Sequence, residues 1–116
     1  MRDWQPFETP AADRRVARVI RTPRAGSDLD DIWLRVALDN PAAADRLIDR
    51  LIDRCQNLAA HPHLGTARPE IAPEARMLIV DDYVALYRVN GADVEIIRIV
   101  HGARRLAGLF DSEPEA

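Results

Sequence analysis

Lysine is absent from this chain of 116 residues, and all sixteen of its basic side chains are arginine. A reaction that needs a lysine as proton donor is therefore excluded. Cys55 is the only cysteine, which excludes an internal disulfide and a cysteine-based zinc site. We expect Cys55 to be a buried, inert thiol, because it falls on the apolar side of a predicted helix.

Other common routes to catalysis also lack their signals. Neither a GxxxxGK[ST] nor a GxGxxG pattern occurs, so no phosphate-binding loop of those types is predicted. The two serines, Ser27 and Ser112, fall at a helix cap and in an acidic tail, which leaves no nucleophile elbow. His61 and His63 flank a proline without a third ligand, so we predict no metal site and no cofactor.

No apolar run approaches the roughly 18 residues that a membrane helix needs, and no signal-peptide core is present. We therefore expect a cytoplasmic protein without membrane contact. The net charge of −3 argues against direct binding of nucleic acid.

Length and composition predict one compact domain, with 47% apolar residues available for its core. Residues 1–15 show no periodicity and are expected to form a flexible leader, which Trp4 and Phe7 could hold onto the domain. Residues 16–107 form the predicted domain, and residues 108–116 form an acidic tail.

Two amphipathic helices are predicted after a strand at residues 16–21, which Thr22-Pro23 ends. Ser27 or Asp28 is expected to cap the first helix. The second is expected to begin at Asn40-Pro41, with asparagine as the cap, and to run to about Ala60. The short link between them indicates an antiparallel helical hairpin.

Three β segments follow a proline-rich loop over residues 61–75; they are expected at 76–80, 83–89 and 94–101. Asn90-Gly91 is a strong signal for a hairpin between the last two. The order β-α-α-β-β-β predicts the α+β class, with an antiparallel curved sheet and the helical hairpin packed on one face. The opposite face is expected to be open to solvent or to a partner.

Five sequence blocks in this order resemble ParE-type toxins of the ParE/RelE superfamily. They are RTPRAGSDLDDIW (21–33), DNPAAADRLID (39–49), LAAHPHLG (58–65), YVALYRV (83–89) and VEIIRIVHGARRL (94–106). The resemblance implies the same helical hairpin on a curved sheet. It also implies the toxin of a type II toxin–antitoxin system, a non-enzymatic inhibitor of DNA gyrase that is held inactive by a ParD-like antitoxin.

The RelE branch of the superfamily cleaves mRNA on the ribosome instead, with a cluster of Lys, Arg and usually Tyr or His. The lysines of that cluster are missing here, and Ile79 stands where the branch has a strand arginine. An endoribonuclease is therefore the alternative, and a non-toxic interaction module is a third possibility.

Unpaired arginines are expected to gather late in the chain, and we predict that they contact gyrase carboxylates. The candidates are Arg88, Arg98, His101, Arg104 and Arg105. In the alternative interpretation His101 merely ends a strand, and the arginines pair with Glu95, Asp81 or Asp82.

Antitoxin contacts are predicted along an apolar groove between the hairpin and the sheet. The candidates are Trp33, Tyr83, Tyr87 and Arg76. Core packing is the alternative role for the tryptophan, because of its helical spacing, and for the two tyrosines, which lie on one side of a strand.

Overall fold

The computed structural model describes residues 17–102. The predicted leader and acidic tail, together with Arg104 and Arg105, lie outside this range. Within it, the elements follow one another as β2 (Val19–Arg21), α1 (Pro23–Ala37), α2 (Pro41–Gln56), the 3₁₀-helix η1 (Asn57–Ala59), β3 (Thr66–Ala67), β4 (Arg76–Val80), β5 (Tyr83–Asn90) and β6 (Asp93–His101).

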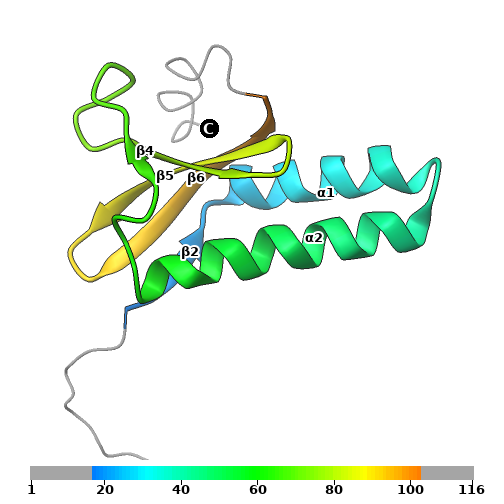
Figure 1. Ribbon diagram of the computed structural model, residues 1–116, viewed down its shortest axis with the longest axis horizontal. Coiled ribbons are helices and arrows are strands. Elements are labelled where there is room, and N and C mark those ends of the chain that lie inside the picture. The colour runs from blue at the N-terminus through cyan, green and yellow to red at the C-terminus, as the bar shows by residue number, and fades with distance from the viewer. Residues whose placement is uncertain (1–16, 103–116) are drawn as a thin grey trace, which may run out of the picture.

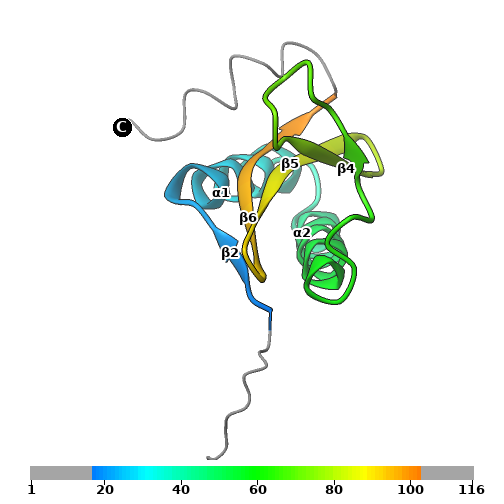
Figure 2. The same cartoon turned by 90° about the vertical axis from the view of Figure 1, so that its left-hand side faces the viewer.

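The strands form one curved sheet in the order β2-β6-β5-β4-β3, and the two helices pack on one of its faces (Figures 1 and 2). The predicted α+β class is confirmed, and β4, β5 and β6 form the expected antiparallel meander. The sheet as a whole is mixed, because β2 joins the edge of β6 in parallel. β3 adds a short antiparallel strand within the loop that was expected to be irregular.

Helix α1 begins at the threonine–proline pair, and its cap, Thr22, lies five or six residues before the expected cap at Ser27 or Asp28. The Thr22 hydroxyl oxygen accepts a hydrogen bond from the Ala25 amide at 3.1 Å, and Pro23 occupies the first helical turn. Proline suits that position, because its fixed φ is helical and it lacks an amide hydrogen. The prediction that Ser27 or Asp28 caps the helix is therefore wrong, and Asp28 is left for another role.

Helix α2 begins as predicted. The Asn40 side-chain oxygen accepts a hydrogen bond from the Ala43 amide at 3.0 Å, and Pro41 follows the cap. The α-helix ends at Gln56 rather than near Ala60, because the last residues tighten into the 3₁₀-helix η1.

The main core lies between the helical hairpin and the sheet. Leu51, Leu58, Tyr87, Val94 and Ile96 are completely buried there. Burying an aliphatic side chain of this size contributes roughly 1.5–3 kcal/mol.

Cys55 also lies in this core, as predicted, with 5% of its surface exposed. Burial raises the pKa of its thiol to about 11.

A β-bulge in β6 changes the alternation of its side chains. Leu86 lies opposite Arg98, but Tyr87 lies opposite Ile96, so Ile97 is an extra residue. Ile96 and Ile99, three residues apart, both pack in the main core as a result. The strand is regular beyond the bulge, which keeps Arg98 and His101 on opposite sides as expected.

The opposite face of the sheet is partly covered, contrary to the expectation that it is open. Ile71 and Ala72, from the segment before β4, pack against Leu86 and Ile97. Ile79 remains 57% exposed on this side. Across residues 17–102, neither α-helix has the length and apolar composition to cross a membrane.

Candidate functional site

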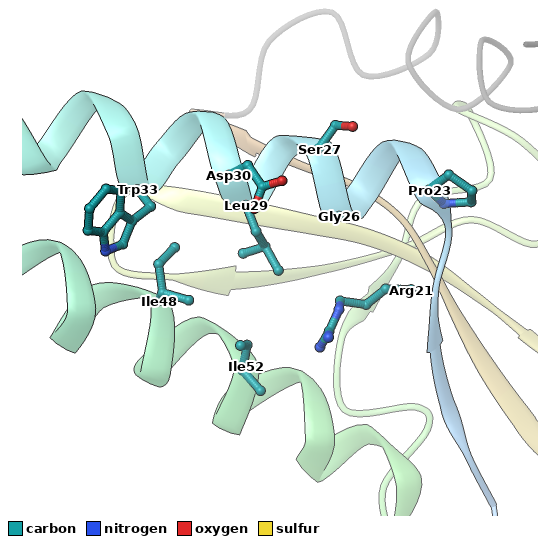
Figure 3. Close-up of a pocket in the computed structure, with 9 residues that line it drawn as sticks. All are labelled: Arg21, Pro23, Gly26, Ser27, Leu29, Asp30, Trp33, Ile48 and Ile52. Atoms are coloured by element: carbon teal, nitrogen blue, oxygen red, sulfur yellow. The ribbon is translucent and has the colours of Figure 1, made fainter.

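A groove runs between the two helices and the end of β2, and we call it the hairpin groove (Figure 3). Its volume is about 540 Å³. Its lining residues are Arg21, Pro23, Gly26, Ser27, Leu29, Asp30, Trp33, Ile48 and Ile52.

The groove exists because both helices have apolar stripes wider than the sheet can cover. Leu29 is buried in the core, whereas Ile48 and Ile52 pack against that core with one side and remain half-buried. Their free sides line the groove together with Trp33. This leaves an apolar strip between α1 and α2. Its shape suits an amphipathic helix or an extended segment of a partner.

The two ends of the groove differ in chemistry. The Trp33 indole lies at one end and donates a hydrogen bond from Nε1 to Asp45 Oδ1 at 2.8 Å, which fixes its ring. Arg21 lies at the other end (Figure 3) and is exposed, and its side chain makes no hydrogen bond or ion pair with the other residues in 17–102. The groove can therefore hold apolar side chains along its length and a carboxylate at the Arg21 end.

Tyr87 and Arg76, which are cross-strand neighbours, together hold the loop that follows η1. The Tyr87 hydroxyl accepts from the Gly65 amide at 2.9 Å and donates to the Pro62 carbonyl at 2.8 Å. Arg76 Nη2 donates to the carbonyls of Gly65 at 2.7 Å and His63 at 3.1 Å. In this network, the side chains of Tyr87 and Arg76 bind backbone groups of the LAAHPHLG block and so fix the conformation of the loop.

The four predicted antitoxin residues are thus not brought together. Tyr87 is fully buried and Tyr83 is 8% exposed, which agrees with their alternative role in the core. Arg76 is engaged by loop carbonyls. Of the four, Trp33 alone lines the hairpin groove.

Arg98 belongs to a buried ion pair. Its Nε and Nη2 donate to the two carboxylate oxygens of Asp28 at 2.7 and 3.0 Å, and one of these oxygens also accepts from the Ile99 amide at 2.9 Å. The two side chains are 9% and 10% exposed. Asp28 therefore links α1 to the part of β6 that extends past the end of β2. Arg98 is buried in this ion pair and is not exposed for contact with a target protein.

Arg88 is also engaged by carboxylates. Its Nε donates to Glu95 at 2.7 Å, and Nη1 lies 3.4 Å from Glu74. The Glu95 carboxylate accepts a further hydrogen bond from Asn90, and this bond, with Arg88, lowers the Glu95 pKa. The premise that these arginines are unpaired is wrong for both Arg88 and Arg98, and the alternative pairing with Glu95 is confirmed for Arg88.

His101 lies at the far end of the same pair of strands. The His101 ring packs edge-on against the Tyr83 ring, with ring centroids 5.1 Å apart, and His101 is exposed. Tyr83, the β5 residue paired with His101, lies five positions before Arg88, a distance of about 17 Å along the strand. The described candidates for target contact therefore do not form one patch.

Metal ligands do not converge in the described part of the chain. Residues 17–102 contain no group of three or more His, Cys, Asp or Glu side chains that could hold a metal ion.

Three important residues escaped prediction from the sequence. Arg21 appeared only as part of a strand, Asp28 as a helix cap, and Gly65 as a loop residue. A Cβ atom on Gly65 would lie 2.7 Å from the Met77 carbonyl oxygen and from Tyr87, so only glycine fits. The residues that contact Asp28 and Gly65 come from β4, β5 and β6, and no sequence signal indicates these contacts.

Comparisons with known proteins find a ParE family model and relatives named as ParE and RelE toxins. The family model described as the ParE toxin of type II toxin–antitoxin systems, parDE, matches residues 19–106. The chain is 37% identical to Toxin ParE3 of Caulobacter vibrioides over 79% of this chain and 93% of that protein. It is 31% identical to Toxin ParE1 of Mycobacterium tuberculosis, over 73% and 89% respectively.

Toxin RelE2 of Caulobacter vibrioides is similar to the same region, with 36% identity over 77% of this chain and 99% of that protein. The fold is similar to a solved chain from the chromosomal ParDE TA system of P. aeruginosa. That chain has a TM-score of 0.66 and 26% identity, over 76% of this chain and 98% of its own length.

Proposed function

This chain belongs to the ParE toxin family of type II toxin–antitoxin systems, and from that membership we propose that it inhibits DNA gyrase by direct contact and is neutralised by a ParD-like antitoxin. The proposal assigns it no catalytic step. Its two surfaces are the hairpin groove for the antitoxin and the end of β6 for the target.

The observation that supports a non-enzymatic function is that Arg88 and Arg98, the arginines of β5 and β6, are both paired with carboxylates. An RNA-cleaving site uses free cationic groups to stabilise charge on the phosphate. Here the guanidinium groups of Arg88 and Arg98 are already matched by carboxylates at 2.7 Å, and the sequence provides no lysine to replace them.

Antitoxin binding is proposed for the hairpin groove because it combines an apolar strip with Arg21 at its end. A partner helix with two or three apolar residues on one face and an acidic residue near the end would satisfy both features. Reversing the charge with Arg21→Glu should weaken antitoxin binding roughly tenfold or more, because a like-charge contact replaces an attractive one. Arg46→Glu, on an exposed position of α2 outside the groove, is the matched control.

Target binding is proposed for the end of β6, where exposed His101 is followed by Arg104 and Arg105. Arginine pairs provide bidentate contacts to carboxylates on a protein surface. Replacing both arginines with alanine should relieve growth arrest and inhibition of gyrase supercoiling in vitro, and should leave antitoxin affinity unchanged.

Arg46→Ala/Arg54→Ala is the control for that pair, because it removes the same charge from exposed positions of α2. Full toxicity of the Arg104→Ala/Arg105→Ala variant, with the control behaving identically, would refute the proposed target surface.

Ribosome-dependent mRNA cleavage is the second candidate function, and the specific observation in its favour is the similarity to relatives named Toxin RelE2 and Toxin RelE3, each 36% identical. A translation-dependent cleavage assay beside the supercoiling assay separates the two. Cleavage by catalytic amounts of the purified chain would overturn the gyrase proposal. Inactivity in both assays, with a tight antitoxin complex, would indicate a non-toxic interaction module.

A further inference from the structure

The residues before β2 are additional to the domain that this chain shares with its relatives. The family match begins at residue 19, so the first 18 residues precede it. They contain Trp4 and Phe7, two of the six aromatic residues in the chain. Large aromatic side chains so close together are costly to leave in water, since each buries about 150–250 Å² when it packs.

The start of the described chain lies beside the hairpin groove. Ala17 is four residues before Arg21, which lines one end of the groove, and the chain enters α1 directly after β2. In Figure 3, β2 leads up to Pro23 at this same end. A segment that precedes Ala17 therefore begins about 13 Å of extended chain from the groove.

The length of the leader is sufficient to fold back along the groove. Phe7 lies ten positions before Ala17, and this stretch spans at most about 36 Å when extended. The groove follows α1 from Gly26 to Trp33, about 10 Å at the helical rise. Trp4 and Phe7 are about 9 Å apart in a polyproline II segment, whose three residues per turn place both on one side, and Pro6 between them favours that conformation over a helix.

Charge favours the same placement. Arg21 is exposed and has no partner for its guanidinium within residues 17–102. The leader has carboxylates beside its aromatic residues, Asp3 next to Trp4 and Glu8 next to Phe7. With either aromatic residue in the groove, the adjacent acid comes within reach of its cationic end.

We propose that residues 1–16 dock in cis into the hairpin groove. In this arrangement Trp4 and Phe7 pack on the free sides of Ile48 and Ile52, and Glu8 or Asp3 pairs with Arg21. The leader then acts as an intramolecular competitor for any partner of the groove. This last consequence rests on the proposed function, because it takes the groove to be the antitoxin site.

The expected effect follows from the effective concentration of a tethered segment, which is in the millimolar range for a short linker. A leader with millimolar intrinsic affinity is then docked about half of the time, and one ten times tighter is docked about nine-tenths of the time. The affinity of a competing partner falls by the fraction of open groove, about two- to tenfold.

Methyl NMR of the full chain tests the docking without any antitoxin. The variant Trp4→Ala/Phe7→Ala removes the docking groups, and Gln5→Ala/Thr9→Ala is the matched control in the same segment. We expect upfield ring-current shifts of the Ile48 and Ile52 methyl resonances in the parent and the control, with nuclear Overhauser contacts to leader aromatic protons. The aromatic double variant should lose both.

Identical methyl spectra for the two variants would overturn the docking. Shifts that disappear on dilution would overturn docking in cis, because they would mean that the leader enters the groove of a second molecule. Shifts that are independent of concentration support it.

Antitoxin affinity is measured separately, with a purified ParD-like antitoxin as the probe. A two- to tenfold tighter complex for Trp4→Ala/Phe7→Ala than for its control supports competition. Methyl shifts as expected with unchanged affinity would uphold the docking, and would instead overturn the assignment of the groove as the antitoxin site.

Discussion

Removing one partner of the ion pair between Asp28 and Arg98 should destabilise the domain more than breaking any exposed ion pair in the described chain. The pair is bidentate, nine-tenths buried, and shares its carboxylate with the Ile99 amide. Asp28→Ala leaves a buried guanidinium without this partner and an orphaned backbone N–H. Breaking a buried pair from one side costs about 3–5 kcal/mol.

That loss is large for a domain of this size, whose total stability is expected to be about 5–15 kcal/mol. With a urea dependence of about 1.5 kcal/mol per molar, the midpoint of unfolding should fall by about 2–3 M. Circular dichroism at 222 nm in a urea titration measures the shift.

Two further variants separate charge from packing. Asp28→Leu/Arg98→Met removes both charges at similar volume, so the remaining loss should be the unsatisfied Ile99 amide, about 1–3 kcal/mol. The double variant should therefore be more stable than Asp28→Ala. Arg50→Ala breaks an ion pair with Asp81 whose side chains are 53% and 48% exposed, and should cost less than about 1 kcal/mol.

Equal midpoints for Asp28→Ala and Arg50→Ala would refute this reasoning. They would mean that water reaches the Asp28 carboxylate as easily as it reaches the surface pair. If the reasoning holds, loss of toxicity in an Arg98 variant reports a destabilised domain and is no evidence for a target contact.

Three other perturbations test the loop, the thiol and an acidic side chain. Gly65→Ala should cost about 1–3 kcal/mol in thermal or urea unfolding, because its Cβ would lie 2.7 Å from the Tyr87 hydroxyl; an unchanged midpoint would contradict the fixed loop. Cys55, with its pKa raised to about 11 by burial, should react with a thiol reagent at pH 8 about a hundredfold more slowly than an unfolded control. Equal rates would show that the core opens readily. Hydrogen bonds from Asn90 and Arg88 lower the pKa of Glu95. The contribution of this carboxylate to the free energy of unfolding is therefore present above the ordinary glutamate pKa, and it is lost as the pH falls through the lowered pKa of the folded state. Glu95→Gln should accordingly lose up to about 1 kcal/mol at pH 7 and nothing in strong acid, as measured by urea midpoints at each pH.

Much of the architecture could be read from local patterns. The apolar stripes of both helices, the Asn40-Pro41 start and the turn near Gly91 all appear where periodicity and cap chemistry predict them. These features depend on neighbours within a few residues, so a sequence displays them directly. The start of α1 was misplaced because Thr22-Pro23 serves at once to end a strand and to cap a helix.

The candidate sites were less predictable. Late arginines looked like a surface cluster, yet Arg98 turns into the interior to meet a carboxylate 70 residues earlier in the chain. Trp33 was predicted for a partner contact and does line the groove, whereas Arg21 at its other end carried no signal. A groove is made of the outward sides of two elements, and its residues are adjacent only after those elements have packed.

By itself, the sequence determined which segments become the two α-helices and strands β2, β4, β5 and β6, which of their faces are apolar, and that no lysine, internal disulfide or cysteine-based zinc site takes part. Those properties follow from residue identity and spacing. Only the tertiary structure decided that β2 lies parallel to β6, that Asp28 neutralises Arg98, and that Tyr87 holds the loop at Gly65. Each of these depends on which distant groups meet when the core excludes water, because a buried charge or amide must then find a partner wherever the fold provides one.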